Sequence, residues 1–252
     1  MSEYSGHVAL VTGSATGVGR ACVLQFADRG FNVVVNYSKS EAEALETAAA
    51  AKERGAEVLV CGCDVADDRE VRKMIAKIDE KFGRLDVLVN NAATTSFVPH
   101  HDLESLNELM WDRMLDVNLK GPFFVTRAAA ELLQRDNGGS VVNVSSVAGL
   151  SGNGSSIAYC ASKGGLNTMT KSLARVLAPK VRVNAVLPGP IDSRWIKEGN
   201  PKWDLDKIVA PYPIPKASSP DDIADAVLYF ALGTSMTTGQ ILPVDGGQTL
   251  LP

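Results

Sequence analysis

Seven short apolar runs, separated by segments with helical periodicity, restrict the fold of this chain more than any other feature. The runs are rich in Val, Leu and Ile and do not alternate between apolar and polar residues, which is typical of strands covered on both faces. The candidate strands are residues 7–12, 32–36, 57–61, 85–90, 140–144, 181–187 and 240–244. The candidate helices are residues 19–29, 41–54, 69–82, 103–119, 121–134, 159–178 and 220–232. Strands that alternate with helices predict an α/β fold, with a doubly wound parallel sheet of about seven strands and helices on both faces.

The chain is predicted to form a single Rossmann-like domain over residues 1–252. Hydrophobic residues make up 45% of its 252 residues, enough to bury one sizeable core. Neither a Ser/Gly/Pro-rich linker nor an internal repeat divides it. The pattern breaks at residues 192–219, where Pro residues gather with Trp195, Trp203 and Tyr212. A long irregular segment in a compact domain is typical of a lid or binding loop, and a loosely ordered surface excursion is the alternative.

Composition argues against several classes of partner. The formal net charge is −4 and no basic cluster is visible, which disfavours nucleic acid. No apolar stretch reaches the roughly 18 residues that a membrane-spanning helix needs, and the N-terminus lacks the features of a secretory signal. The four cysteines are too few for a disulfide scaffold, and Cys61 and Cys63 have no second ligand cluster nearby. We expect a soluble, cytoplasmic protein without a metal, a membrane partner or a nucleic-acid partner.

A glycine-rich turn between the first candidate strand and the first candidate helix predicts a site for phosphate groups. Glycine allows a tight turn and a close approach of a pyrophosphate to the backbone, and the helix amino end stabilises its charge. The spacing Gly-x-x-x-Gly-x-Gly differs from the more familiar Gly-x-Gly-x-x-Gly, and glycines also serve turns that bind nothing. The residues expected to contact a dinucleotide here are Gly13, Thr16, Gly17, Val18 and Gly19.

The end of the second strand favours NADP(H) over NAD(H). NAD sites usually carry an acidic residue about 20 residues beyond the glycines, where it accepts from the ribose 2′-hydroxyl. This chain has Asn36, Tyr37, Ser38 and Lys39 there instead, all expected at the cofactor. Neutral groups beside a lysine would accommodate a 2′-phosphate. Because a single lysine is more often solvated and Thr16 is not basic, NAD(H) is kept as the alternative cofactor.

The third and fourth strands end in further candidate contacts to the cofactor. Asp64, followed by Val65, is placed either to accept from the adenine amino group or to cap the next helix. After the fourth strand, Asn91 and Ala92 have small side chains that would let the adenosine ribose lie against the backbone.

Ser146, Tyr159 and Lys163 are the candidate catalytic residues. Tyr159 and Lys163 are four residues apart and share one helix face. A tyrosine pKa is about 10, and a neighbouring ammonium is expected to lower it toward the range useful for acid/base chemistry. Ser146 follows a strand at the sheet edge where ligands bind, and its hydroxyl would stabilise a developing alkoxide. A Tyr-x-x-x-Lys pair alone is also common on solvated helices.

These features recur together in a known family. They comprise Thr12-Gly13-x-x-x-Gly17-x-Gly19, Asn90-Asn91-Ala92, Val117-Asn118-Leu119-Lys120-Gly121, Ser146, Tyr159-x-x-x-Lys163, Pro188-Gly189-Pro190-Ile191 and Val244-Asp245-Gly246-Gly247. Through them the chain resembles the short-chain dehydrogenase/reductase family over essentially its whole length. Within that family it is similar to reductases of 3-oxoacyl chains on acyl carrier protein and to sugar or polyol dehydrogenases.

The resemblance implies further roles. Asn118 would hold a water that extends the proton relay from Lys163. Pro188, Gly189, Ile191 and Ser193 would lie at the cofactor, the last two against the nicotinamide carboxamide. Residues 192–216 would form the substrate loop, and the assembly would be a homotetramer. Ala93 and Ser193 depart from the usual Gly and Thr without removing a reacting group.

The expected function is NAD(P)-dependent interconversion of a ketone and a secondary alcohol, with Tyr159 as the acid/base. A 3-oxoacyl thioester, a polyol or sugar, and a small carbonyl compound are the alternative substrates. An acyl carrier protein would need basic residues at the site mouth, for which Lys180, Arg182, Arg194 and Lys197 are candidates. The aromatic residues of the substrate loop suit an apolar or ring-shaped substrate. An inactive cofactor-binding scaffold or redox sensor is the alternative of another class.

Overall fold

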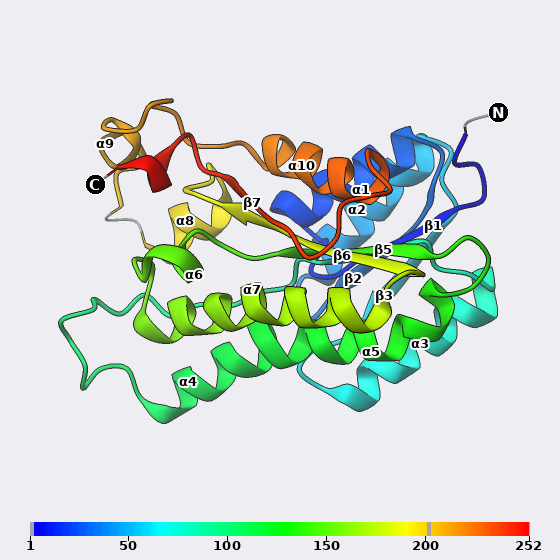
Figure 1. Ribbon diagram of the computed structural model, residues 1–252, viewed down its shortest axis with the longest axis horizontal. Coiled ribbons are helices and arrows are strands. Elements are labelled where there is room, and N and C mark those ends of the chain that lie inside the picture. The colour runs from blue at the N-terminus through cyan, green and yellow to red at the C-terminus, as the bar shows by residue number, and fades with distance from the viewer. Residues whose placement is uncertain (1–2, 201–202, 252) are drawn as a thin grey trace.

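A seven-stranded parallel sheet forms the centre of the protein (Figure 1). A computed structural model describes residues 3–200 and 203–251. The strands are β1 (Val8–Val11), β2 (Asn32–Tyr37), β3 (Val58–Gly62), β4 (Val87–Asn90), β5 (Gly139–Val144), β6 (Val181–Pro188) and β7 (Ile241–Val244). Their order across the sheet is β3-β2-β1-β4-β5-β6-β7, and all neighbouring pairs are parallel. The predicted doubly wound sheet is therefore confirmed, with its switch point between β1 and β4.

Helices cover both faces of this sheet (Figure 1). One face carries α1 (Gly17–Asp28), α2 (Glu41–Glu53) and α10 (Pro220–Leu232), whose apolar side chains form one core cluster with alternate strand residues. The other face carries α3 (Asp68–Phe82), α4 (Glu108–Leu115), α5 (Gly121–Leu133) and α7 (Ile157–Leu177). Strands such as β1, in which all four residues are buried, lie between the two layers. Burial on both faces explains why the strand sequences show no in/out alternation.

The helix expected over residues 103–119 differs in the structure. α4 begins only at Glu108, because the Asn107 side chain caps it by accepting from the Met110 backbone N–H at 3.0 Å. It then passes into a π-helical turn, η1 (Asp116–Lys120), which leads directly into α5. Such turns are rare and shift the side chains that follow them around the helix axis. Here the turn carries the buried Asn118.

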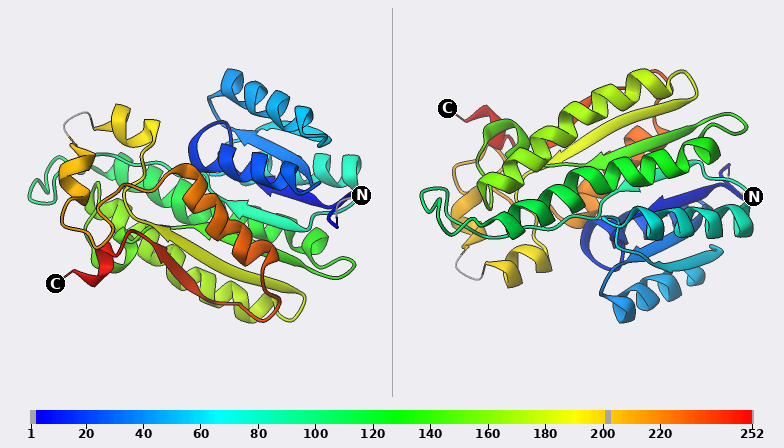
Figure 2. Two further views of the ribbon diagram at one scale, coloured as in Figure 1. Left: turned by 90° about the horizontal axis from the view of Figure 1, so that it is seen from above. Right: turned by 90° about the horizontal axis from the view of Figure 1, so that it is seen from below.

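Residues 192–219 contain two short helices that their sequence did not predict. These are α8 (Arg194–Gly199) and α9 (Leu205–Val209), and Asp204 caps the second by accepting from the Lys207 N–H. Two more short elements, α6 (Ala148–Ser151) and η2 (Gln248–Leu250), were also not predicted. All four gather at the end of the sheet where the strands have their carboxyl ends (Figures 1 and 2). Helices of one or two turns are too short to show apolar periodicity.

Two basic residues considered for a carrier-protein surface lie at the other end of the sheet, near the amino ends of the strands. Lys180 and Arg182 stand at the amino end of β6, away from the carboxyl ends of the strands. The Arg182 guanidinium donates to the Phe230 and Ala231 carbonyl oxygens at 2.6 and 2.8 Å, near the end of α10. A cation there satisfies carbonyls that the helix leaves unpaired. The expectation that these two residues flank the site mouth is wrong.

The described residues were also compared with the requirements for a membrane-spanning helix and for a metal site. Among the described residues, no helix combines the length and apolar character needed to cross a membrane. The same part of the chain holds no group of three or more His, Cys, Asp or Glu side chains arranged for a metal ion. All four cysteines are buried and unlinked.

Candidate functional site

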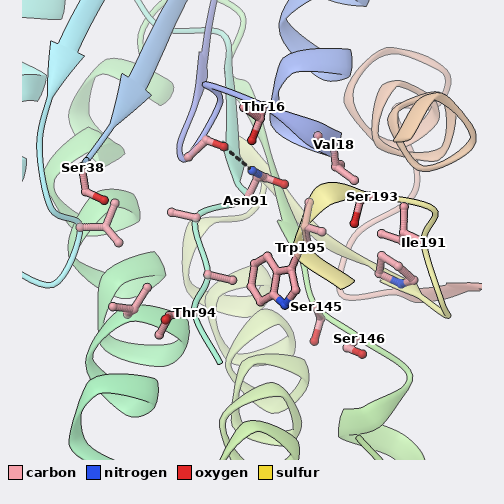
Figure 3. Close-up of a pocket in the computed structure, with 18 of the residues that line it drawn as sticks. Thr16, Val18, Ser38, Asn91, Thr94, Ser145, Ser146, Ile191, Ser193 and Trp195 are labelled. Atoms are coloured by element: carbon pink, nitrogen blue, oxygen red, sulfur yellow. Dashed lines mark hydrogen bonds between the residues drawn. The ribbon is translucent and has the colours of Figure 1, made fainter. Parts of the chain in front are cut away.

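A cavity of about 440 Å³ opens at the carboxyl ends of the strands, across the switch point of the sheet (Figure 3). Most residues expected at a cofactor line it. They are Gly13, Thr16, Gly17, Val18, Asn36, Ser38, Lys39, Asp64, Val65, Asn91, Ala92, Tyr159, Lys163, Pro188, Gly189, Ile191 and Ser193. Ser146 also lines this cavity. Parallel strands bring these segments together because all of their carboxyl ends meet at one edge.

Two of the expected cofactor contacts do not line the cavity. Tyr37 turns away, and its hydroxyl donates to the Glu41 carboxylate at 2.8 Å. Gly19 lies beneath the glycine turn, where an added Cβ would be 2.6 Å from both the Asn91 Nδ2 and the Gly13 carbonyl oxygen. Gly19 is therefore needed for close packing of the turn, and its expected contact with a cofactor stays a prediction.

The glycine turn has the geometry of an anion cradle. Gly13 and Gly17 have φ values of +60° and +57°, a region that disfavours side chains. At Gly13 an added Cβ would also lie 2.8 Å from the Ala92 Cα. Helix α1 begins at Gly17, and Thr16 before it makes no side-chain capping bond. The first N–H groups of α1 consequently remain available at the cavity wall, which fits a pyrophosphate group.

The Asn36 side chain connects the glycine turn to β3 and the residues after it through hydrogen bonds. Its Oδ1 accepts from the Gly13 N–H at 3.0 Å. Its Nδ2 donates to the carbonyl oxygens of Cys61 and Cys63 at 3.2 and 3.0 Å. The side chain keeps the cavity free of a carboxylate, as expected, but its amide is already engaged and offers no donor to a 2′-phosphate. Ser38 and Lys39 remain as the expected groups for that role.

Asp64 lies at the cavity and is not a helix cap. Its carboxylate accepts from the Ala66 N–H at 3.0 Å and pairs with Arg113 at 2.8 Å. The cap of α3 is Asp67, whose Oδ1 accepts from the N–H groups of the helix's first turn. The alternative that Asp64 caps the helix is therefore wrong. Arg113 also lines the cavity, a position that no sequence signal revealed.

Ser146, Tyr159 and Lys163 converge where β5 ends and α7 begins. Lys163 is only 2% exposed, and its Nζ donates to the Val144 carbonyl oxygen at 2.9 Å. The same Nζ lies 5.7 Å from the centre of the Tyr159 ring. The Ser145 hydroxyl donates to the Lys163 carbonyl oxygen at 3.2 Å, which ties the strand end to the helix. The expected juxtaposition of the three residues is thus present.

The pKa values in this site differ from the sequence-based expectation. Burial raises the pKa of Tyr159 to about 12, although a hydrogen bond with Ser146 acts in the opposite direction. Burial likewise lowers the pKa of Lys163 to about 7. Removal from water favours the neutral form of each group, and the ammonium lies over the ring face. The expected lowering of the Tyr159 pKa by Lys163 is therefore not found, and the phenol is held protonated at neutral pH.

Asn118 is engaged within the protein. Its Oδ1 accepts from the Thr94 N–H at 2.8 Å. Its Nδ2 donates to the Thr94 carbonyl oxygen at 2.9 Å and to the Ser162 hydroxyl at 3.1 Å. The side chain thus ties the segment after β4 to helix α7. It does not line the cavity, and its expected role in holding a water stays a prediction.

A second cavity, of about 510 Å³, adjoins the first. The two share Ser146, Tyr159, Gly189, Trp195 and Ile196. Residues of the expected substrate loop form much of the second wall, including Trp203, Asp204, Lys207, Ile208 and Tyr212. Figure 3 shows the Trp195 indole among the residues that line the first cavity. The hydroxyl groups of Ser146 and Tyr159 therefore stand where the two cavities meet.

Comparisons with known proteins agree with this geometry. A family model described as "Enoyl-(Acyl carrier protein) reductase" matches residues 13–249. A protein of Streptomyces violaceoruber, provisionally named ketoacyl reductase 2 of the granaticin polyketide synthase, is 41% identical over 97% of this chain and 96% of its own length. The 3-oxoacyl-[acyl-carrier-protein] reductase FabG of Thermotoga maritima is 36% identical over 97% of this chain and 98% of its own.

Solved structures are similar as well. A protein from Burkholderia xenovorans, provisionally named as a short-chain dehydrogenase/reductase, superposes with a TM-score of 0.92. It is 36% identical, and the match covers 97% of this chain and 98% of that one.

Replacing Lys163 with Met tests the burial of its ammonium group. In the parent protein the pKa of Lys163 is about 7, below the value of roughly 10.4 in an unfolded chain. Between these pH values the unfolded chain binds more protons, so the stability of the parent rises with pH, by on the order of 1.4 kcal/mol for each pH unit. Methionine does not titrate, so the free energy of unfolding of the variant lacks this rise. Any amount by which the variant is more stable than the parent should therefore shrink from pH 6 to pH 9.

Thermal unfolding of parent and variant at several pH values measures this slope. Loss of the hydrogen bond to Val144 is independent of pH and shifts only the offset between the two curves. Tyr159 adds no slope in this range, because its phenol stays protonated in both states below about pH 10. The exposed Lys171 on the same helix provides the matched control, Lys171→Met. Parallel curves of stability against pH for parent and Lys163→Met would contradict the lowered pKa of Lys163.

Proposed function

The chain belongs to the short-chain dehydrogenase/reductase family, and we propose that it uses NADP(H) to reduce the ketone of a 3-oxoacyl thioester to a secondary alcohol. It is an oxidoreductase similar to ketoacyl reductases. The Streptomyces and Thermotoga relatives, whose printed names give ketoacyl or 3-oxoacyl substrates, match nearly the whole chain. Their names support the thioester substrate.

The observation that carries this proposal is the protonated phenol of Tyr159, partly buried beside Ser146 at the junction of the two cavities. A nicotinamide cofactor, when bound, supplies the hydride that adds to the carbonyl carbon. The Tyr159 hydroxyl gives its proton to the carbonyl oxygen, so that an alcohol forms. The Ser146 hydroxyl donates to the same oxygen while negative charge develops on it. Because its pKa is raised, the phenol carries its proton at neutral pH and is present as the proton donor.

In this proposal Lys163 restores the proton of Tyr159. Its Nζ lies over the Tyr159 ring, and its pKa of about 7 lets it take up and release a proton near neutrality. A phenolate left after proton donation would be stabilised by the nearby ammonium. The bond to the Val144 carbonyl holds the side chain in this position. The intact set of Ser146, Tyr159 and Lys163 argues against an inactive scaffold.

The residues of the first cavity fit the proposed cofactor. Gly13, Thr16, Gly17 and Val18 would hold the pyrophosphate, Asp64 and Val65 the adenine, and Asn91 and Ala92 the adenosine ribose. Pro188, Gly189, Ile191 and Ser193 would lie against the nicotinamide end. The proposed location is the cytoplasm, in keeping with four unlinked cysteines.

Substitution of Tyr159 by Phe should abolish reduction while leaving cofactor binding intact. The variant keeps the ring but loses the proton that the carbonyl oxygen needs. Turnover should fall by about 10²- to 10⁴-fold, the range that a positioned acid contributes. Absorbance at 340 nm with a 3-oxoacyl thioester measures turnover, and fluorescence titration with NADPH measures binding. The exposed Tyr229 gives the control Tyr229→Phe. Undiminished turnover in Tyr159→Phe would remove the basis of the proposal.

The proposed preference for NADP(H) rests on three polar residues around one end of the first cavity. Ser38 and Lys39 follow β2, and Arg194 reaches across from α8 to pair with Glu43 of α2 at 2.9 Å. A 2′-phosphate would offer the Arg194 guanidinium a doubly charged partner in place of one carboxylate. Arg194, which the sequence suggested only as part of a carrier-protein surface, would then be the second cation.

Arg194→Gln should weaken NADPH use selectively. The KM for NADPH is expected to rise about five- to tenfold, while the KM for NADH changes by less than about twofold, because only NADPH carries the 2′-phosphate. Lys197→Gln on the same helix is the control, since Lys197 pairs with Asp192 and does not line the first cavity. Equal effects on both cofactors would contradict the proposed contact.

We keep a homotetramer as the proposed assembly. Apolar side chains are exposed on helices and at the C-terminal turn, among them Leu109 of α4, Val176 of α7 and Leu250, with exposed fractions of 80%, 74% and 79%. A contiguous apolar patch usually marks an interface, and these residues are the candidates for contacts between subunits. Light scattering on the eluting protein should give a mass about four times the 26.7 kDa of one chain. A particle of the mass of a single chain would exclude the tetramer.

A further inference from the structure

We propose that the acyl part of the substrate carries an aromatic or similarly flat ring, which binds against the indoles of Trp195 and Trp203 in the second cavity. This inference rests on the proposed reductase function, and it names the substrate class of that same site. It follows from the shape and chemistry of a wall that takes no part in proton transfer.

The second cavity extends from the reacting hydroxyls into an aromatic chamber. Trp195, Trp203 and Tyr212 line it together with small and branched apolar side chains, among them Val147, Ala148, Pro190, Ile196 and Ile208. The two indoles remain 41% and 38% exposed, although tryptophan normally buries most of its large apolar surface. A ring lying against them would remove that surface from water and gain ring–ring contact as well.

Trp203 is held in place from outside the cavity. Phe97 packs edge-on against its indole, with ring centres 5.4 Å apart and an interplanar angle of 86°. Phe97 also lies so close to Gly199 that an added Cβ there would be 2.4 Å from the Phe97 Cε2. Phe97 thus supports one side of the indole before a ligand binds. A prearranged flat surface favours a rigid ring over a flexible chain, which would lose many rotamers on binding.

In the described part of the chain, the basic residues on and near this cavity pair with carboxylates, and the charged residues that line it are Asp204 and Lys207. Lys207 pairs with Asp204 at 3.0 Å, and Lys197 pairs with Asp192 at 2.6 Å. Arg194 pairs with Glu43, while Lys180 and Arg182 lie at the far edge of the sheet. The four basic residues considered for an acidic carrier protein therefore either pair with carboxylates or lie elsewhere. This wall therefore suits recognition of an apolar, ring-bearing part of the substrate.

Two thioesters of equal carbon count test the inference. The N-acetylcysteamine thioesters of 3-oxo-5-phenylpentanoic acid and 3-oxoundecanoic acid both present an eleven-carbon acyl group, one with a ring and one without. We expect the parent protein with NADPH to favour the phenyl thioester in kcat/KM by about tenfold, the equivalent of about 1.4 kcal/mol. Trp203→Leu should reduce this preference to less than about threefold by raising the KM of the phenyl thioester alone.

Two further variants separate recognition from folding. Trp203→Phe keeps a ring and should restore most of the preference. Trp111→Leu on α4 replaces a tryptophan that lines neither cavity, and it should leave both thioesters unaffected. Equal efficiency for the two thioesters in the parent, or an equal loss for both in Trp203→Leu, overturns the inference and leaves the reductase function standing. Turnover of neither thioester by the parent overturns the reductase function and this inference with it.

Discussion

The ammonium of Lys163 lies 2.9 Å from the Val144 carbonyl oxygen, between the end of β5 and helix α7, with almost no access to water. Burying a cation is costly unless hydrogen bonds compensate it, so the side chain has few alternative positions. The contact fixes α7 relative to the strand end and thereby sets Tyr159 beside Ser146. Burial also shifts the pKa values of Lys163 and Tyr159 in opposite directions, down to about 7 and up to about 12. The protonation states of both groups follow from this burial.

The parallel sheet turns distant parts of the chain into neighbours. Because every strand carries its carboxyl end to one edge, the glycine turn, Asp64 and Ser146 meet at a single cavity. Asn36 then joins the glycine turn to β3 through hydrogen bonds in both directions. The second cavity is built largely by another part of the chain, which includes the short helices α8 and α9. The parallel sheet thus brings together the residues of the first cavity, and a segment of shorter elements shapes the second.

Features encoded by local pattern could be predicted from the sequence. The seven apolar runs correspond to the seven strands, and the helix at residues 220–232 begins and ends where expected, since Ser219 and Pro220 are strong start signals. Ser146, Tyr159 and Lys163 were identified because their spacing is fixed by a helix turn and a strand end. The break at residues 192–219 was recognised as a possible lid, and residues of that segment do line the second cavity. Its short helices escaped notice because they have no periodicity.

Features that depend on the packing of distant segments could not be predicted. Arg113 and Arg194 reach the first cavity from helices that approach it at angles no local pattern specifies. The alternation along β2 sends Tyr37 to Glu41 on the outside while Asn36 faces inward. Lys180 and Arg182 were misplaced because a sequence shows which residues are basic and not which edge of the sheet they occupy. The pKa of Tyr159 is raised and not lowered because desolvation by the surrounding protein outweighs the effect of any single neighbour.

A crystal structure of the protein with NADP⁺ bound is the most direct test of the arrangement around Lys163. We expect the nicotinamide ring at the junction of the two cavities, with its C4 facing the hydroxyls of Tyr159 and Ser146. Lys163 should remain buried between Val144 and the Tyr159 ring. A nicotinamide placed away from these hydroxyls, or a Lys163 side chain turned out into water, would contradict it.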